Sequence, residues 1–181
     1  YLWVKERGLT YAVNSDHTIA KTVGFIEDIS SQKKLEQHLR RQATFDDLTG
    51  LLTHSAATTH FNKQLGLAKR QYTPLTMVKI NLNADGVLSQ MIYEEKNQII
   101  KLAAKDLHGN IREGDILARV ASDKLLLLLP NTNVRDAKHL LDDVINSIHN
   151  LNFIKKDGQQ HSLAICAGIA TFPEDGESVE E

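Results

Sequence analysis

The sequence feature that most restricts the possible folds of this chain is a run of five leucines at positions 125–129. They follow a second apolar-rich run, residues 116–120, across the tetrapeptide Ala-Ser-Asp-Lys at 121–124. Two short apolar runs joined by a tight polar turn predict a β-hairpin. Each run is far shorter than the roughly 20 apolar residues that a membrane-spanning helix needs. We therefore expect the fold to be organised around this hairpin.

Helix and strand patterns alternate around the hairpin. Apolar residues recur at helical spacing in three segments, 55–70, 94–107 and 134–148, and the last of these is strongly amphipathic. Strands are expected at 75–82, behind Pro74, and at 163–172, closed by Pro173. The order helix, βα, ββ, αβ predicts an α+β, ferredoxin-like domain in which helices cover one face of a central antiparallel sheet.

The first 45 residues follow a different pattern. Residues 1–30 predict short strands with a break at Gly8 and a turn at 14–17, too few to bury a core alone, so we expect them to belong to a domain whose earlier part lies outside this sequence. Residues 31–45 predict a charged connecting helix, capped by Ser30 or Ser31. Its apolar residues are mainly Leu35 and Leu39. Two interpretations are equally supported: the helix pairs with the same helix of a second chain through these leucines, or it is a solvent-exposed spacer.

Composition excludes several classes of function. The 181 residues contain 21 Lys and Arg against 23 Asp and Glu, and the net charge of −2 gives no basis for nucleic-acid binding. No segment predicts membrane contact. The single cysteine, Cys166, cannot form an internal disulfide, which is consistent with the cytoplasm, and its apolar neighbours predict a small core residue.

Three motifs in order give the chain a family resemblance. They are Asp-Asp-Leu-Thr-Gly-Leu at 46–51, Arg-Glu-Gly-Asp at 112–115, and Arg-Val-Ala-Ser-Asp-Lys-Leu at 119–125. The chain resembles the GGDEF (diguanylate cyclase) family, whose nucleotidyl-cyclase-like fold agrees with the pattern above. Residues 23–30 resemble the end of a PAS sensor domain. The implied organisation is PAS strands at 1–30, a signalling helix at 31–45, and a GGDEF domain at 46–181 that lacks its last helix.

The resemblance weakens at the catalytic positions. The resemblance implies that active members use two GTP molecules and hold Mg²⁺ with a strand carboxylate and with the third residue of the hairpin motif, so Mg²⁺ is the implied cofactor if GTP binds. Here the strand position is Asn81, and Lys124 takes the place of an acid, while Asp123 remains as a weak candidate metal ligand. Ala121 and Ser122 replace two glycines, which restricts the backbone and the approach of GTP, and Leu125 ends the motif.

Two further sets of positions follow from the resemblance. The guanine-contacting residues of the family correspond to Ser89 and Asn97, which with Asn81 form the candidate nucleotide site. Arg112 and Asp115 correspond to the family's product-binding site, where arginine pairs with phosphate. The alternative is a surface ion pair at the start of a strand. The arginine that completes this site in the family corresponds to about Asp143, which would repel phosphate.

These departures predict a non-catalytic regulatory GGDEF module of a bacterial cyclic-di-GMP signalling protein, which controls an attached EAL phosphodiesterase domain. One alternative is an active diguanylate cyclase with an unusual site. Another is a cyclic-di-GMP receptor that binds through Arg112 and Asp115. The expected partners are GTP or cyclic-di-GMP and a second copy of the chain, paired through the PAS segment and the connecting helix.

Overall fold

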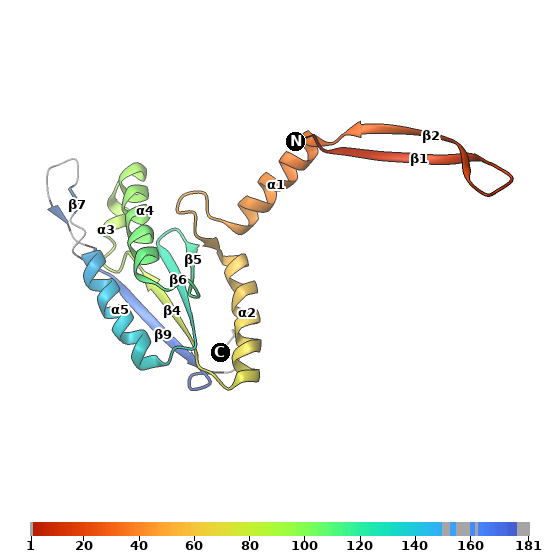
Figure 1. Ribbon diagram of the computed structural model, residues 1–181. Coiled ribbons are helices and arrows are strands. Elements are labelled where there is room, and N and C mark those ends of the chain that lie inside the picture. Colours follow the sequence, from red (N-terminus) through yellow and green to blue (C-terminus); the bar gives the residue numbers. More distant parts are fainter. Residues whose placement is uncertain (1, 150–152, 155–159, 162, 177–181) are drawn as a thin grey trace. The chain divides into compact units, whose positions relative to one another are not determined.

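The computed structural model describes residues 2–149, 153–154, 160–161 and 163–176. The chain divides into two compact units, residues 1–42 and residues 43–181. The first contains a β-hairpin and most of one helix, and the second contains a five-stranded sheet with its helices (Figure 1).

The hairpin of the first unit consists of β1 (Val4–Val13) and β2 (Ile19–Asp28), which pair antiparallel. In the turn between them, the Asp16 carboxylate accepts hydrogen bonds from the backbone N–H and the hydroxyl of Thr18, at 3.0 and 2.6 Å. These bonds also lower the pKa of Asp16, the hydroxyl contributing most. The predicted turn is thus held by a local side-chain bond.

The predicted break at Gly8 is wrong, because β1 runs through it without interruption and Gly8 pairs with Gly24. A Cβ atom on Gly24 would lie 2.6 Å from the carbonyl oxygen of Arg7. This glycine allows close approach of the two strands instead of ending one of them.

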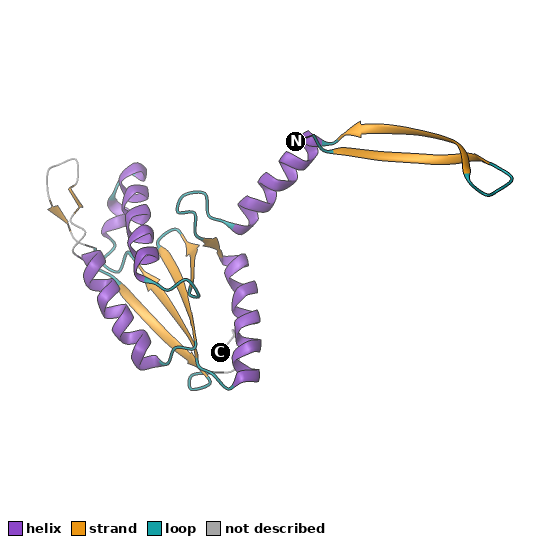
Figure 2. Ribbon diagram, viewed as in Figure 1, coloured by secondary structure: helices purple, strands orange, loops and turns teal. Residues whose placement is uncertain are grey.

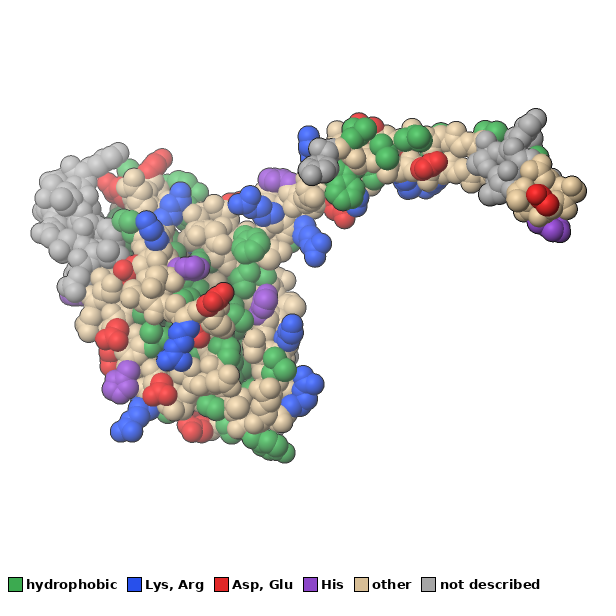
Figure 3. Space-filling model, viewed as in Figure 1, with side chains coloured by type: hydrophobic (Ala, Val, Ile, Leu, Met, Phe, Trp, Pro, Cys, Tyr) green, Lys and Arg blue, Asp and Glu red, His purple; other side chains and the backbone are tan. Residues whose placement is uncertain are grey.

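Large hydrophobic side chains lie exposed on the hairpin surface (Figure 3). They are Trp3, Val4, Leu9, Val23, Phe25 and Ile26. A two-stranded hairpin buries too little surface to be stable alone in water. Side chains of this kind are typical of strands that pack against further structure.

Helix α1 (Ser30–Thr44) follows β2 and has no buried residue. Its first N–H, at Ser30, donates to the Asp28 carboxylate at 2.8 Å, while the Ser30 hydroxyl accepts a hydrogen bond from the Trp3 N–H at 3.0 Å. Asp28 therefore caps the helix, and the prediction of a serine cap is wrong. Leu35 and Leu39 are 59% and 56% exposed, so the apolar face of the helix is open.

The sheet of the second unit has the strand order β3-β5-β6-β4-β9 (Figure 2). Its members are β3 (Leu52–Thr53), β4 (Leu75–Asn81), β5 (Ile116–Ala121), β6 (Lys124–Pro130) and β9 (Cys166–Phe172). Neighbouring strands are antiparallel except β3 and β5, which are parallel. The predicted α+β class is confirmed, with a short parallel edge that makes the sheet mixed.

Helices cover both faces of this sheet, so the prediction of helices on one face is wrong (Figure 1). On one face, α4 (Tyr93–Asn110) and α5 (Val134–His149) pack on alternate residues of the central strands. The buried strand residues on this face are Val78, Ile80, Leu125, Leu127 and Leu129. On the other face, α2 (His54–Gln71) buries Phe61 and Leu65 against Leu75 and Leu128. The leucine run is thus buried from two sides.

Several short elements lie outside what periodicity predicts. They are β3, α3 (Val87–Gln90), β7 (Phe153–Ile154) and β8 (Gln160–His161). Strand β9 begins at Cys166, three residues after Leu163. Cys166 itself is exposed, which contradicts the prediction of a core position. Among the described residues, no helix is both long enough and apolar enough to cross a bilayer.

Helix α4 provides a test of the packing. Leu107 is fully buried against the sheet, whereas Leu102 on the same helix is 47% exposed. Leu107→Ala should lower the free energy of unfolding of the sheet unit by about 2–5 kcal/mol, because it leaves a cavity in the core. Leu102→Ala should lower it by less than about 1 kcal/mol. Urea titrations followed by circular dichroism measure both, and equal losses would contradict this packing.

Candidate functional site

The tip of the β5–β6 hairpin carries the residues that correspond to the family's catalytic motif. Ala121 pairs with Lys124, so Ser122 and Asp123 form a two-residue connection. Neither of these two residues adopts a positive φ angle. The tip therefore forms without the conformational freedom of glycine, and the replacement of glycines here leaves no backbone strain. Leu125, the last motif residue, is fully buried in the core.

The end of β4 reaches this tip. The backbone N–H of Leu82 donates to the carbonyl of Asp123 at 2.9 Å. The Asn83 side-chain amide donates to the Asp123 carboxylate at 3.2 Å and to the Ser89 hydroxyl at 2.8 Å. The side-chain oxygen Oδ1 of Asn83 accepts a hydrogen bond from the backbone N–H of Leu88 at 2.9 Å. Asn83 thus connects two of the predicted site residues, Ser89 and Asp123.

Asn83 was not among the predicted site residues. It lies two residues beyond Asn81, in the loop that follows β4, where the alternation of a strand gives no signal. Asn81 itself accepts a hydrogen bond from the backbone N–H of Asn83 at 3.1 Å. It pairs in register with Lys124 on β6 and with Cys166 on β9. Side chains at paired positions of neighbouring strands lie about 5 Å apart at Cβ.

A divalent cation does not fit these side chains. Mg²⁺ prefers an octahedron of oxygen ligands that includes carboxylates. The oxygen of Asn81 carries no charge and is already hydrogen bonded, and both oxygens of Asp123 accept hydrogen bonds, from Asn83 and Ser122. The Lys124 ammonium adds positive charge beside them. Within the described part of the chain, no three His, Cys, Asp or Glu side chains come close enough to hold an ion.

The remaining predicted nucleotide contact, Asn97, lies apart from this network. It is a half-buried residue in the early part of α4, and its side chain makes no hydrogen bond with the described residues. The structure therefore unites Asn81, Ser89 and Asp123 through Asn83, and leaves Asn97 outside the hydrogen-bonded group.

An ion pair fastens the loop at 46–51 to the same hairpin. Arg119 Nη1 donates to both carboxylate oxygens of Asp46 at 3.1 Å, and Nη2 donates to the carbonyl of Ser122 at 2.8 Å. The Asp46 carboxylate also accepts bonds from the backbone N–H and hydroxyl of Thr49, at 2.8 and 2.7 Å. Gly50, with φ of 71°, closes the loop. The Nε atom of Arg119 is buried without a hydrogen-bond partner.

The protonation equilibrium of Asp46 reflects two opposing effects. Burial is the largest single effect and disfavours the charged form, but the combined hydrogen bonds from Thr49 and Arg119 outweigh it. The pKa of Asp46 therefore lies below its ordinary value of 3.8. The carboxylate is ionised at neutral pH and neutralises Arg119.

The predicted product-binding pair, Arg112 and Asp115, forms a closed turn between α4 and β5. The Asp115 carboxylate accepts a hydrogen bond from the backbone N–H of Arg112 at 2.9 Å, and the Asp115 N–H donates to the Arg112 carbonyl at 3.0 Å. The predicted alternative of an ion pair between these side chains is wrong, because the aspartate binds the backbone instead. The Arg112 guanidinium is exposed and belongs to no ion pair with the described residues.

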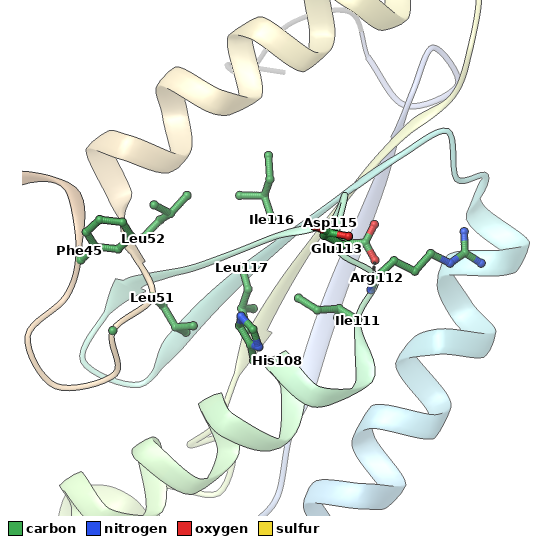
Figure 4. A pocket seen from close by; sticks show the side chains of 11 residues that line it. Phe45, Leu51, Leu52, His108, Ile111, Arg112, Glu113, Asp115, Ile116 and Leu117 are labelled. Carbon is green, nitrogen blue, oxygen red and sulfur yellow. Dashed lines mark hydrogen bonds between the residues drawn. The ribbon is translucent and has the colours of Figure 1, made fainter.

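A cavity of about 320 Å³ adjoins this turn. Apolar side chains from the 46–51 loop, the end of α4 and β5 form most of its lining, among them Leu51, Ile111 and Leu117 (Figure 4). The Arg112 guanidinium points away from the side of the cavity formed by Leu51 and Phe45. Arg112 therefore lines the cavity from the side of the turn, opposite Leu51 and Phe45.

The fold and these motifs agree with one family. Residues 43–181 match the family model described as diguanylate cyclase, GGDEF domain. The chain belongs to the GGDEF family.

The chain is similar to several curated proteins of cyclic-di-GMP signalling. It is 25% identical over 161 residues to the probable diguanylate cyclase DgcE of Escherichia coli, covering 86% of this chain and 14% of that protein. It is 24% identical over 144 residues to the cyclic di-GMP phosphodiesterase NbdA of Pseudomonas aeruginosa, covering 79% of this chain and 18% of that protein. The chain spans less than half the length of these curated relatives.

Solved structures of GGDEF domains share the fold. The coiled coil and GGDEF domain of DgcB from Caulobacter crescentus, in complex with c-di-GMP, matches with a TM-score of 0.70 at 15% identity, over 82% of this chain and 81% of that one. The GGDEF domain of FimX from Pseudomonas aeruginosa matches with a TM-score of 0.64 at 19% identity, over 71% and 79% of the two chains. These identities establish the fold alone.

The ion pair between Asp46 and Arg119 predicts a pH-dependent stability. Asp46→Asn should lower the free energy of unfolding at pH 7 by about 1–3 kcal/mol, because the partly buried arginine loses its counter-charge. The folded pKa of Asp46 is lowered, so its contribution is present above its ordinary value of 3.8 and is lost as the pH falls through the folded value. The difference between variant and wild type should therefore shrink below that pH.

Denaturant titrations from pH 7 down to pH 3 measure this difference. Asp142→Asn, at an exposed position on α5, is the matched control and should change stability by less than about 0.5 kcal/mol. A loss for Asp46→Asn that stays constant across this range would show that the charge of Asp46 is not responsible.

Proposed function

We propose that this chain is the non-catalytic, regulatory GGDEF module of a cyclic-di-GMP signalling protein. The observation that carries the proposal is the pairing of Asn81 with Lys124 at the end of the sheet. By the resemblance, an amide stands at the strand position that holds the metal in the family, and an ammonium lies opposite it where the family has an acid. The half-buried Lys124 has no carboxylate partner among the described residues.

The chemistry of the family explains why this pairing argues against catalysis. Phosphoryl transfer proceeds through positioning of the reactants and neutralisation of the charge that develops on the phosphate oxygens. When bound, Mg²⁺ would supply this neutralisation and would stabilise both the attacking and the leaving oxygen. A lysine can neutralise charge, but it cannot coordinate two oxygens in a fixed geometry. Asp123, already hydrogen bonded to Asn83, cannot compensate alone.

The proposed whole protein places this module between a sensor and an output domain. The exposed hydrophobic surface of the β1–β2 hairpin is consistent with strands of a PAS domain. Relatives named as cyclic di-GMP phosphodiesterases, such as NbdA and PdeB of Shewanella oneidensis, support an attached EAL phosphodiesterase domain as the output. We place the module in the cytoplasm, where GTP and cyclic-di-GMP are available to it.

Incubation of the full-length protein with GTP and either Mg²⁺ or Mn²⁺ tests the proposal. No cyclic-di-GMP should form above background, because Asn81 and Lys124 replace two acids of the family and leave Asp123 as the one remaining candidate metal ligand of the motif. Chromatography of the nucleotide products measures the outcome, with an active diguanylate cyclase as the positive control. Sustained turnover that Asp123→Ala abolishes would establish the alternative, an active cyclase with an unusual site.

A cyclic-di-GMP receptor is the second candidate function, favoured by the exposed Arg112 guanidinium. An arginine in this position can pair bidentately with a phosphate. Glu113, next to the arginine in sequence, opposes such binding, and by the resemblance Asp143 stands where the family has its second arginine. Titration calorimetry with cyclic-di-GMP separates the two functions: binding that Arg112→Ala removes would favour the receptor, and no binding would favour the regulatory module.

The exposed leucines of α1 support dimer pairing through this helix. In the full-length protein, Leu35→Ala with Leu39→Ala should weaken dimerisation, because these two side chains supply most of the apolar surface of the helix. Gln37→Ala with His38→Ala, at exposed polar positions of the same helix, is the control and should leave association unchanged. Sedimentation velocity measures both variants. Unchanged association of the leucine variant would make α1 a spacer.

A further inference from the structure

The cavity beside the turn at 112–115 has the size and the lining of a small-molecule site. We name it the loop–β5 cavity. Its volume is about 320 Å³, and pockets that hold small molecules measure about 300–1,000 Å³ and have mainly apolar walls. Its apolar lining includes Phe45, Leu51, Leu52, Ile111, Ile116 and Leu117 (Figure 4).

Backbone pairing holds one wall of this cavity in place. Phe45 and Leu52 form an antiparallel bridge, and Leu52 also pairs in parallel with Ala118 of β5. Between them, the N–H of Asp46 donates to the carbonyl of Leu51 at 2.8 Å. A wall that is already ordered in the free protein costs a ligand little free energy to order, so the site is preorganised.

Two residues of this wall favour a ring as the ligand. The side chain of Phe45 is 42% exposed although it lines the cavity, so part of the aromatic ring is open to a ligand. Gly50 also lines the cavity, and a Cβ atom added to it would have no atom of the described residues within 4 Å. Aromatic rings prefer to contact one another in offset-stacked or edge-to-face arrangements. An aromatic ligand therefore suits this wall better than an aliphatic one.

The charges around the cavity favour a neutral ligand. Among the described residues, the lining carries two carboxylates, Glu113 and Asp115, against the guanidinium of Arg112 and the imidazole of His108. The Asp115 carboxylate already accepts a hydrogen bond from the backbone N–H of Arg112 at 2.9 Å, and the guanidinium points away from the loop side of the cavity (Figure 4). A charged group buried without a partner costs much free energy, so a phosphate does not suit the apolar part of this cavity.

We propose that the loop–β5 cavity binds a neutral aromatic molecule of one or two rings. The apolar walls hold this ligand, whereas the family resemblance assigns phosphate binding to Arg112. The inference goes beyond the proposed function and does not depend on it. Asp46, in the same wall, is bonded to Arg119, which also holds the carbonyl of Ser122. A bound ring would therefore stabilise the loop at 46–51 and, through Arg119, the hairpin tip.

Titration calorimetry of the full-length protein with indole tests the proposal. Indole, with about nine non-hydrogen atoms, should bind with a dissociation constant of about 0.1–1 mM. Phe45→Ala should weaken binding about fivefold, because the ring contact is lost. Leu52→Trp should abolish binding, because the larger side chain fills the cavity, and its urea transition checks that the variant is folded. Leu102→Ala, at a 47% exposed apolar position of α4, is the control and should have no effect.

Arg112→Ala separates this site from a phosphate site. This variant should leave indole binding within about twofold of wild type, even where it removes binding of cyclic-di-GMP. Absence of indole binding would overturn the proposal and would indicate that a second copy or another segment covers the cavity. Binding that is insensitive to both Phe45→Ala and Leu52→Trp, or that Arg112→Ala weakens as much as Phe45→Ala does, would also overturn it. GTP turnover is measured separately and decides the proposed function alone.

Amide hydrogen exchange tests the link to the hairpin tip. With indole bound, amides of residues 46–52 and of residues 121–124 should exchange more slowly. Asp46→Asn should keep the slowing at 46–52 and remove it at 121–124, because the contact with Arg119 is weakened. Slowing that is confined to residues 46–52 in the wild-type protein would overturn the link.

Discussion

The antiparallel pairing of β4 with β6 is the constraint on which the rest of the second unit depends. Seven residue pairs, from Leu75 with Pro130 to Asn81 with Lys124, fix the register between the two strands. Because side chains alternate, a slip of one residue in β4 would carry Lys79 to the face on which Val78 and Ile80 are buried. The two buried faces on either side of the sheet make such a slip costly. The same register decides that Asn81 meets Lys124, so the core sets the chemistry of the site.

The ion pair between Asp46 and Arg119 extends this constraint to the hairpin tip. Arg119 holds the loop at 46–51 with one nitrogen and the carbonyl of Ser122 with the other. Since a partly buried arginine loses much of its hydration, its attachment is rigid only while the carboxylate remains charged. This single side chain therefore links the start of the sheet unit to the motif residues. The loop at 46–51 and the β5–β6 hairpin, which are far apart in sequence, are thus held together by one arginine side chain.

Periodicity predicted the long elements, because α4, α5, β4 and β6 each bury a continuous face. It could not predict β3 or α3, which contain two and four residues and owe their conformation to their neighbours. The break predicted at Gly8 was wrong because a glycine can serve close strand approach as well as a turn. The presence of helices on both faces of the sheet was not predicted either. The sequence pattern of α2 shows that the helix has an apolar side, but it does not show against which face of the sheet this side packs.

Some residues of the candidate site could be predicted from the sequence, and the reason why the others could not is physical. Asn81, Ser89 and Asp123 could be identified by resemblance, because motifs preserve order along the chain. The role of Asn83 could not, because its bonds to Ser89 and Asp123 exist only once the end of β4 meets the hairpin tip.

In this domain, the residues that stabilise the fold are different from the residues that occupy the candidate site. The residues that hold the sheet together, such as Leu125, Leu127 and Ile80, are fully or almost fully buried. The positions that depart from the family's motif, among them Ala121, Ser122 and Lys124, are exposed or half-buried at the tip and strand ends. A charge reversal there costs the core nothing, since a lysine at the end of a strand remains hydrated. It does reverse the local potential, and with it the kind of ligand that the surface favours. Under the proposed function, a few surface substitutions would remove the metal-dependent chemistry of this domain while its scaffold remains the same.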